Sequence, residues 1–425
     1  MSRRVVVTGL GVVAPNGSTL EQFDAALRSG TSGIRHIPVM KELNFGCTVA
    51  GVPQGVDELC EQAFEEDELL AMNSNHRFGC LAAVNAWTDA GFERPQAGDD
   101  RVYWAAGAVI GTGIGGLDTI AEKLIPNTNQ GKVRRLGSTL VEQIMGSGVS
   151  ARVSGLLALG NQVTSNSSAC STGSEAIAEG CARIRAGLAE RMLCGGSEGS
   201  SHYIWAGFDA MRVLARKYND APEKASRPLS ASADGFVPSC GAGVMHLESL
   251  QSAQARGAPI YAEVLGAAVN CGGQRGGGSM TAPNPESVSR CIKAALADAK
   301  IGPDDIDVIN GHLTATFADP YEVASWSSAL ARAPDKMPVF TATKSMIGHA
   351  LGAAGGIESI AAVLMLHGGY AHPCVNCEDL HPDVEPYAAS IPHEMREMPG
   401  LRTIIKAGFG FGDVNTCLVF CKWDG

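Results

Sequence analysis

The chain has 425 residues, of which 45% are apolar and 18% are charged, a composition that predicts a large hydrophobic core and excludes a disordered protein. A net charge of −11 argues against nucleic acid and anionic membranes as partners. The length exceeds that of one ordinary domain and predicts two lobes or a duplicated fold.

Strand-like and helix-like runs alternate along the chain. The first predicted strands are 4–8, 102–110, 162–165, 191–194 and 243–248, with predicted helices at 20–28, 76–90, 138–158 and 174–185. The pattern restarts near residue 255, with strands 260–270, 306–310, 339–341, 402–407 and 416–421 and helices 285–299, 321–330 and 354–366. This alternation predicts an α/β protein in two halves of similar architecture, 1–255 and 256–425.

The N-terminus enters the first strand directly, without the long apolar region and cleavage site of a signal peptide. We also expect no apolar stretch of the roughly 18 residues that a membrane span requires. The 13 cysteines are an odd number scattered along the chain, which is typical of reduced thiols. These features predict a cytoplasmic protein.

Two glycine motifs raise the hypothesis of dinucleotide binding. They are Gly9-Leu-Gly11-Val-Val-Ala14 and Gly111-Thr-Gly113-Ile-Gly-Gly116, each after a predicted strand. The dinucleotide fingerprint also needs an acidic residue about 20 positions further on, and neither motif has one. We therefore interpret both motifs as turns of the scaffold.

Cys170 stands between predicted strand 162–165 and predicted helix 174–185, in the segment Ser-Ala-Cys170-Ser-Thr-Gly. Free N–H groups and the dipole at a helix N-terminus favour the thiolate, which is the nucleophilic form of cysteine. The small neighbouring residues leave room for a bulky electrophile. We predict that Cys170 is a nucleophile.

Two histidines and one aromatic loop complete the candidate site. His312 follows strand 306–310, and His349 ends the segment Lys344-Ser-Met-Ile-Gly-His349 before helix 354–366. The loop Gly408-Phe409-Gly-Phe411-Gly lies near the end of the chain. Because α/β folds place their chemistry at strand ends, we expect these segments to meet Cys170.

With these segments the chain resembles the elongating β-ketoacyl-[acyl-carrier-protein] synthases of the thiolase-like superfamily over essentially all its residues. The resemblance rests on the Cys170, His312 and His349 segments and on Phe409-Gly-Phe411-Gly, in that order. It implies a duplicated thiolase-like fold with five αβαβα layers, a homodimer and acyl carrier protein as partner. It implies no metal, redox cofactor, nucleic acid or membrane.

The resemblance also implies a reaction, a decarboxylative Claisen condensation that lengthens an acyl group carried by Cys170. The backbone N–H groups of Cys170 and Phe411 would hold the oxyanion, while His312 and His349 would bind the malonyl thioester carbonyl. Lys344 and Glu322 would form a polar pair that orders the histidines.

Further residues receive substrate-binding roles from the same resemblance. Thr314 and Thr316 would contact the pantetheine arm, and Ile110 and Phe409 would belong to the substrate-binding set. A basic cluster is predicted to dock the acidic carrier protein. It consists of Lys132, Arg134 and Arg135.

The chain also departs from the family pattern. The segment after His312 is one residue shorter before Glu322, Ser239-Cys240 replaces a common Gly-Glu, and Asp413 replaces a glycine. These changes leave acyl-chain preference open and keep a specialised polyketide or polyene ketosynthase as an alternative. Three further alternatives are a non-condensing polyketide subunit, a coenzyme A thiolase and a cysteine hydrolase. A cysteine with two histidines argues against all three.

Overall fold

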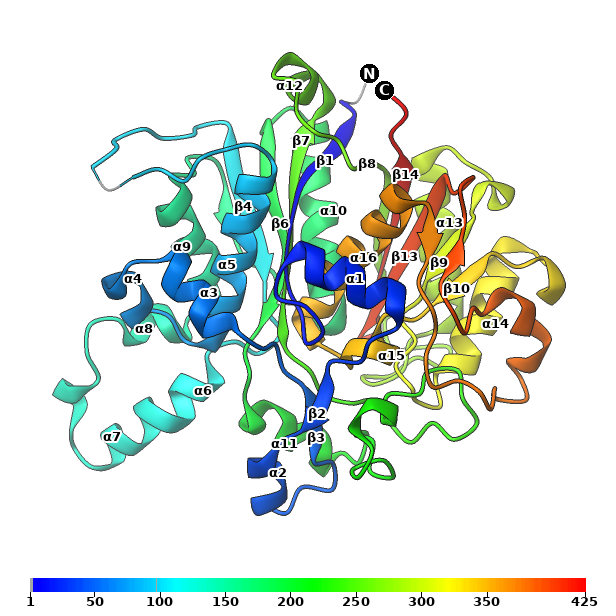
Figure 1. Ribbon diagram of the computed structural model, residues 1–425, viewed down its shortest axis with the longest axis horizontal. Coiled ribbons are helices and arrows are strands. Elements are labelled where there is room, and N and C mark those ends of the chain that lie inside the picture. Colours follow the sequence, from blue (N-terminus) through cyan, green and yellow to red (C-terminus); the bar gives the residue numbers. More distant parts are fainter. Residues whose placement is uncertain (1–2, 97) are drawn as a thin grey trace.

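The computed structural model describes residues 3–96 and 98–425. The strands of the first half are β1 (Val5–Val13), β4 (Ala106–Gly111), β5 (Val163–Thr164), β6 (Arg191–Glu198) and β7 (Gly241–Ser249). Those of the second half are β8 (Ala262–Cys271), β9 (Val308–Asn310), β10 (Val339–Thr341), β13 (Thr403–Gly410) and β14 (Val414–Lys422). Together they form a ten-stranded mixed sheet in the order β10-β9-β13-β14-β8-β1-β7-β6-β4-β5 (Figure 1).

The two halves of the sheet have the same topology. In the first half β7 pairs antiparallel with β1 and β6, and β4 pairs parallel with β6 and β5. In the second half β14 pairs antiparallel with β8 and β13, and β9 pairs parallel with β13 and β10. A short antiparallel contact between β1 and β8 joins the halves. The prediction of a duplicated α/β fold is confirmed.

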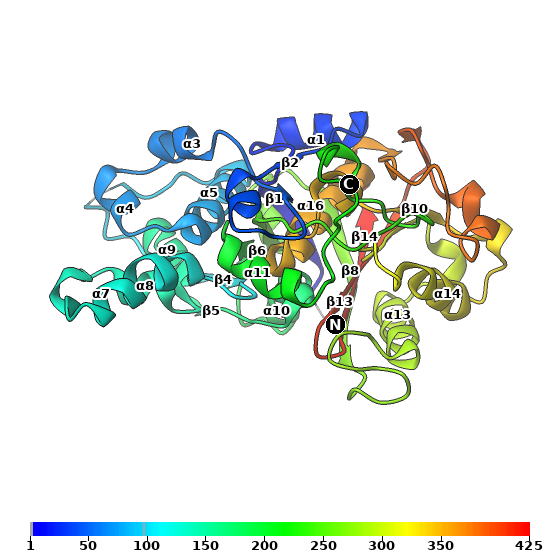
Figure 2. The ribbon, with the colours of Figure 1, turned by 90° about the horizontal axis from the view of Figure 1, so that it is seen from below.

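Helices form three layers around the two half-sheets, as Figures 1 and 2 show. Helices α5 (Ser74–Asp89) and α9 (Gly148–Leu157) cover the outer face of the first half, and α13 (Pro285–Ala299) and α14 (Asp319–Leu330) lie outside the second. Helices α10 (Thr172–Arg185) and α16 (Ala354–Gly368) pack between the half-sheets and against each other. The expected αβαβα layering is therefore present.

The remaining helices and strands lie in the segments that connect these layers. The helices are α1 (Leu20–Ser29), α2 (Pro38–Glu42), α3 (Val56–Ala63), α4 (Glu66–Leu70), α6 (Leu117–Thr119), α7 (Ile125–Asn129), α8 (Leu140–Ile144), α11 (His202–Ala210), α12 (Leu250–Ala255) and α15 (Lys344–Ile347). Short strand pairs are formed by β2 (Ile34–His36) with β3 (Val49–Gly51) and by β11 (Tyr370–Ala371) with β12 (Arg396–Glu397).

Glycines bring the N-terminal ends of α10 and α16 into backbone contact. A Cβ on Gly173 would lie 2.5 Å from the backbone nitrogen of Gly356, and one on Gly355 would lie 2.4 Å from that of Ser174. Neither separation leaves room for a side chain. Cys170 lies in a 3-10 turn two residues before α10, and His349 lies shortly before α16, so this contact brings their segments together.

Two sequence interpretations need correction. Predicted helix 138–158 is two helices, α8 and α9, separated by residues 145–147. Gly9 and Gly11 lie inside β1, not in a turn. Glycine is required at both positions because Cβ atoms there would come within 2.1 and 1.8 Å of carbonyl oxygens in α5. The second glycine motif does form a loop, and the buried carboxylate of Glu198 accepts hydrogen bonds from three of its backbone N–H groups.

The expectation that no apolar stretch reaches about 18 residues has one exception among the described residues. Residues 351–368 form a helical stretch that is long and apolar enough by length and composition. However, 89% of this stretch is buried inside the protein, where α16 lies between the two half-sheets. It is a core helix.

Adding a methyl group at the helix contact should destabilise the fold. Gly173→Ala is expected to lower the free energy of unfolding by about 1–3 kcal/mol, because the methyl group has no space. Gly155→Ala is the matched control, since Gly155 lies exposed in α9 and a Cβ there meets nothing within 4 Å. The control should gain up to about 1 kcal/mol from helix propensity. Equal melting temperatures for the two variants would contradict the proposed constraint.

Candidate active site

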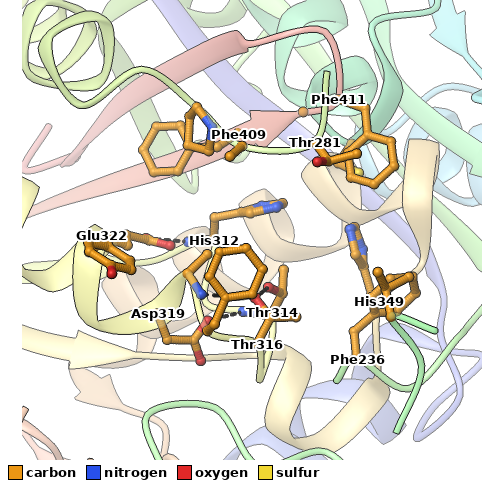
Figure 3. A pocket seen from close by; sticks show the side chains of 18 of the residues that line it. Phe236, Thr281, His312, Thr314, Thr316, Asp319, Glu322, His349, Phe409 and Phe411 are labelled. Carbon is orange, nitrogen blue, oxygen red and sulfur yellow. Dashed lines mark hydrogen bonds between the residues drawn. The ribbon is translucent and has the colours of Figure 1, made fainter. Parts of the chain in front are cut away.

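A cavity of about 610 Å³ lies where the ends of the two half-sheets meet the middle helices. Its wall combines side chains from segments 208–213, 277–288, 312–325 and 409–411 with Cys170, Phe236, His349 and Leu351. Figure 3 shows His312 and His349 entering from two sides, with Phe409 and Phe411 above them. The cavity is largely apolar, so the few polar groups that enter it carry its chemistry.

Cys170, His312 and His349 converge in this cavity. One sulfur or nitrogen atom from each lies within 4.8 Å of the other two. The imidazole rings are nearly perpendicular, at 85°, with centroids 5.4 Å apart. Cys170 and His312 are each 9% exposed and His349 is 3% exposed, so all three are reached only through the cavity. The structure thus brings together the three residues that the sequence analysis selected.

Hydrogen bonds determine which nitrogen of each imidazole carries a proton. The Lys344 ammonium lies 3.4 Å from Nδ1 of His312, and the Leu351 N–H donates to Nδ1 of His349 at 3.2 Å. Since both Nδ1 atoms accept, the proton of each neutral ring lies on Nε2. Burial, with the charge of Lys344 as the next cause, holds the pKa of both histidines well below the usual range. Two neutral N–H donors therefore stand beside Cys170.

The polar partner of Lys344 differs from the prediction. Lys344 forms a buried ion pair with Glu358 of α16, not with Glu322, and donates to the backbone oxygen of His312 at 2.7 Å. The expected Lys344–Glu322 pair is therefore wrong. Glu358 stands in an apolar helix, which gave the sequence analysis no reason to connect it with Lys344.

Glu322 instead holds the backbone of the segment after β9. Its carboxylate accepts from the N–H groups of His312 at 2.7 Å and Leu313 at 2.8 Å (Figure 3). Burial raises the pKa of Glu322 to about 7, although these hydrogen bonds oppose the shift. Asp319, which the sequence analysis missed, binds the N–H groups of Thr314 and Ala315 in the same way. Two carboxylates thus order the shortened segment.

The expectation of a resting thiolate at Cys170 is not supported. Burial raises the pKa of the Cys170 thiol to about 11, while the charge of Lys344 and a hydrogen bond from the Phe411 N–H oppose this shift. Here desolvation outweighs the effect of the helix terminus. Cys170 is a thiol at neutral pH and must lose its proton as it reacts.

Asp413 fixes the turn that carries Phe411. Its buried carboxylate accepts from the backbone N–H groups of Gln274 at 2.9 Å and Asn284 at 2.8 Å. A Cβ on Gly272 would lie only 2.2 Å from this carboxylate. The replacement of the family's glycine by Asp413 therefore ties the Phe411 turn to the 272–284 segment, part of which lines the cavity.

The other predicted site residues divide into two groups. Thr314, Thr316 and Phe409 line the cavity, and the two threonine hydroxyls lie 3.0 Å apart. Ile110 lies in the hydrophobic core with 1% exposure and does not belong to this cavity wall, so its contact with substrate stays a prediction.

The predicted basic cluster is exposed but lies away from the cavity wall. Lys132, Arg134 and Arg135 follow α7, which Figures 1 and 2 place at the opposite end of the long axis from α14. The sequence analysis missed Arg212 and Arg275, which are both exposed. Arg212 lies between wall residues Met211 and Val213, and Arg275 lies two residues before Gly277 of the wall.

The cysteine and the two histidines also have the residue types of a zinc site. Among the described residues they are the group whose donor atoms lie close enough to share an ion. Binding an ion through Nε2 would require both rings to move their proton to Nδ1 and give up the hydrogen bonds there. The hydrogen bonding favours donor imidazoles over metal-binding ones.

Known proteins resemble the chain over its whole length. The family described as "Beta-ketoacyl synthase, N-terminal domain" matches residues 2–253, and "Beta-ketoacyl synthase, C-terminal domain" matches residues 261–378. The 3-oxoacyl-[acyl-carrier-protein] synthase 1 of Haemophilus influenzae is 34% identical over 424 residues, 100% of both chains. The synthase 2 of Vibrio cholerae is 35% identical over 422 residues, 98% of this chain and 99% of its own.

Solved structures show the same similarity in three dimensions. A β-ketoacyl synthase from Burkholderia phymatum has a TM-score of 0.88 and 29% identity, covering 99% of this chain and 100% of its own. A type II polyketide ketosynthase in complex with its acyl-carrier protein has a TM-score of 0.87 and 27% identity, covering 100% of both chains.

The raised pKa of Cys170 predicts how its reactivity changes with pH. Alkylation of Cys170 by iodoacetamide should rise about tenfold per pH unit from pH 7 to 9, because the thiolate fraction grows at that rate below the pKa. The rate is measured by mass spectrometry on the Cys170 peptide, with glutathione as the reference thiol. A plateau of the Cys170 rate below pH 8 would show a stabilised thiolate and contradict the assignment.

Proposed function

The chain belongs to the β-ketoacyl synthase family, and on this premise we propose that it is a 3-oxoacyl-[acyl-carrier-protein] synthase. This acyltransferase lengthens a fatty acyl chain by two carbons through decarboxylative condensation with malonyl-acyl carrier protein. The observation that carries the proposal is the convergence of one thiol and two Nε2–H donors in an apolar cavity. A nucleophile and a pair of neutral donors are what the two half-reactions require.

In the first half-reaction Cys170 attacks the thioester carbonyl of an acylated carrier. A bond forms between its sulfur and the acyl carbon, the bond to the carrier sulfur breaks, and the cysteine proton passes to that leaving thiol. The N–H groups of Cys170 and Phe411 would stabilise the oxyanion. Gly410 supports this role, since a Cβ there would crowd the Cys170 nitrogen at 3.2 Å.

In the second half-reaction the malonyl thioester carbonyl accepts hydrogen bonds from Nε2 of His312 and His349. The bond to the terminal carboxylate breaks, carbon dioxide leaves, and the electron pair remains as an enolate that these donors stabilise. The enolate carbon attacks the acyl group on Cys170, and the released thiolate takes a proton from water. Thr314 and Thr316 would contact the pantetheine arm that delivers the malonyl group.

We also propose a cytoplasmic homodimer that needs no metal or redox cofactor, with halves 1–255 and 256–425 carrying Cys170 and the two histidines respectively. Strand β5 supports dimerisation, because it ends the sheet and leaves its outer edge for pairing. Two exposed apolar side chains flank this edge, Trp104 at 73% and Leu188 at 59% exposure, and Asn161 bonds to both of their backbone oxygens.

A ketosynthase of a specialised polyketide or polyene pathway is the second candidate. It is favoured by the departures at Asp413 and after His312 and by the likeness to a type II polyketide ketosynthase. The chemistry at Cys170 is the same in both cases. The masses of products formed from a series of acyl-carrier proteins distinguish the two candidates, since only the first predicts activity with simple saturated acyl groups.

Separate variants should divide the two half-reactions. Cys170→Gln is expected to abolish acylation and condensation while retaining malonyl decarboxylation, because both imidazole donors remain. His349→Ala should reduce decarboxylation by about a hundredfold or more, the usual effect of removing one oxyanion donor. Mass spectrometry of the acylated protein and release of carbon dioxide measure the two steps. A folded Cys170→Gln protein without decarboxylation would refute these roles, as would acylation of another cysteine in the unmodified enzyme.

The docking surface can be located by charge reversal. Because Lys132, Arg134 and Arg135 lie away from the cavity of their own chain, they would serve the cavity of a second subunit. Arg134→Glu with Arg135→Glu should raise KM for acyl-carrier protein, and the defect should shrink as salt screens the wild-type attraction. Alkylation of Cys170 by iodoacetamide should not change.

Arg212→Glu is the comparison variant, because Arg212 stands beside the cavity wall of the same chain. An unchanged KM in the Arg134/Arg135 variant, together with a raised KM in the Arg212 variant, would move the docking surface to the cavity mouth.

A further inference from the structure

Lys406 is a fully buried lysine for which the proposed mechanism gives no role. It lies in β13, has 0% exposure, and pairs in register with Asn310 of β9, two residues before His312. Its ammonium nitrogen lies 2.7 Å from Oε2 of Glu358 and donates to the backbone oxygen of Ala407. Lysines are almost never fully buried unless they are paired, so the partner of Lys406 indicates its function.

That partner is shared with the active site. Oε1 of Glu358 binds the Lys344 ammonium, and Lys344 in turn contacts His312 at both its backbone oxygen and Nδ1. A continuous line of contacts therefore runs from Lys406 through Glu358 and Lys344 to His312. With two ammonium groups and one carboxylate, the buried group has a net charge of +1.

The Lys406 ammonium changes the net charge that the buried group places near His312. With Lys344 alone, Glu358 would form a neutral pair with it and cancel most of its field at His312. Because Lys406 occupies the other carboxylate oxygen, one positive charge is left over, and its effect is strong in a buried site. Burial lowers the pKa of Lys406, while the carboxylate of Glu358 favours its ammonium form.

We propose that Lys406 is a positioning residue for decarboxylation, which shares Glu358 with Lys344 and so leaves positive charge beside the histidine that binds the enolate oxygen. This inference rests on the proposed function. Decarboxylation depends on the charge because it creates an enolate at His312. Acylation of Cys170 depends on it less, because backbone N–H groups hold that oxyanion.

The test variant is Lys406→Met, which retains the volume and removes the charge. Malonyl decarboxylation should fall on the order of tenfold to a hundredfold, the effect of one charge over several ångström at an effective dielectric constant near 20. Acylation of Cys170 by acyl-carrier protein should stay within about threefold of the unmodified enzyme, because its backbone donors are unchanged. A merely structural role would affect both half-reactions equally.

The double variant Glu358→Gln with Lys406→Met provides the charge-matched control. It returns the buried group to a net charge of +1, carried by Lys344 alone, and should recover at least about tenfold in decarboxylation over Lys406→Met by the same charge effect. If Lys406→Met does not fold, the decarboxylation rate of the double variant tests the proposal instead. In that case the double variant should decarboxylate within about tenfold of the unmodified enzyme.

The outcomes separate this inference from the proposed function. If the unmodified enzyme neither acylates Cys170 nor decarboxylates malonyl-carrier protein, the proposed function is wrong. If the unmodified enzyme does both, three results overturn the role of Lys406. These are an unchanged decarboxylation rate in Lys406→Met, equal losses in both half-reactions, and a double variant that fails to recover or to fold.

Discussion

The backbone contact between α10 and α16 is the constraint on which the site depends. Gly173 and Gly355 let the two helices meet without side chains between them. One helix begins just after Cys170 and the other shortly after His349, so a nucleophile from the first half reaches a donor from the second. The duplicated topology provides the rest of the arrangement. His312 follows β9, Phe409 lies at the end of β13 and Phe411 lies in the turn after it, and all three line the same cavity.

Burial determines the electrostatic character of this site. It keeps Cys170 a thiol and both imidazoles neutral, so these three groups offer hydrogen-bond donors that carry no charge. A buried charged group lies behind His312, where Lys344 and Lys406 both pair with Glu358. Such an arrangement suits a reaction in which negative charge appears only after carbon dioxide has left, because the donors are oriented beforehand.

The sequence alone predicted the parts of the structure that depend on local pattern. Helix 285–299 and strand 339–341 have the predicted bounds, and the segments around Cys170, His312 and His349 identified the three residues that meet in the cavity. What it missed depends on long-range packing. Glu358 resembles an isolated charge in an apolar helix until folding places it against Lys344, and the thiolate expected from the helix terminus ignored the desolvation of a closed cavity.

Local sequence patterns also gave a wrong interpretation where the role of a residue depends on what packs against it. Gly9 and Gly11 have the letters of a turn, yet they serve a strand that lies against the backbone of α5. The neighbour that determines the role of these glycines belongs to another element of the fold, which periodicity and spacing do not identify.

The central claim is that carbon–carbon bond formation is coupled to decarboxylation at Cys170, His312 and His349. The most direct measurement supplies acyl-carrier protein and malonyl-carrier protein labelled with carbon-13 in the free carboxylate, and counts labelled carbon dioxide against products two carbons longer. The account predicts one labelled carbon dioxide for each elongated product and no label retained in the product. An elongated product formed without release of the label, or hydrolysis of the acyl group without elongation, would contradict it.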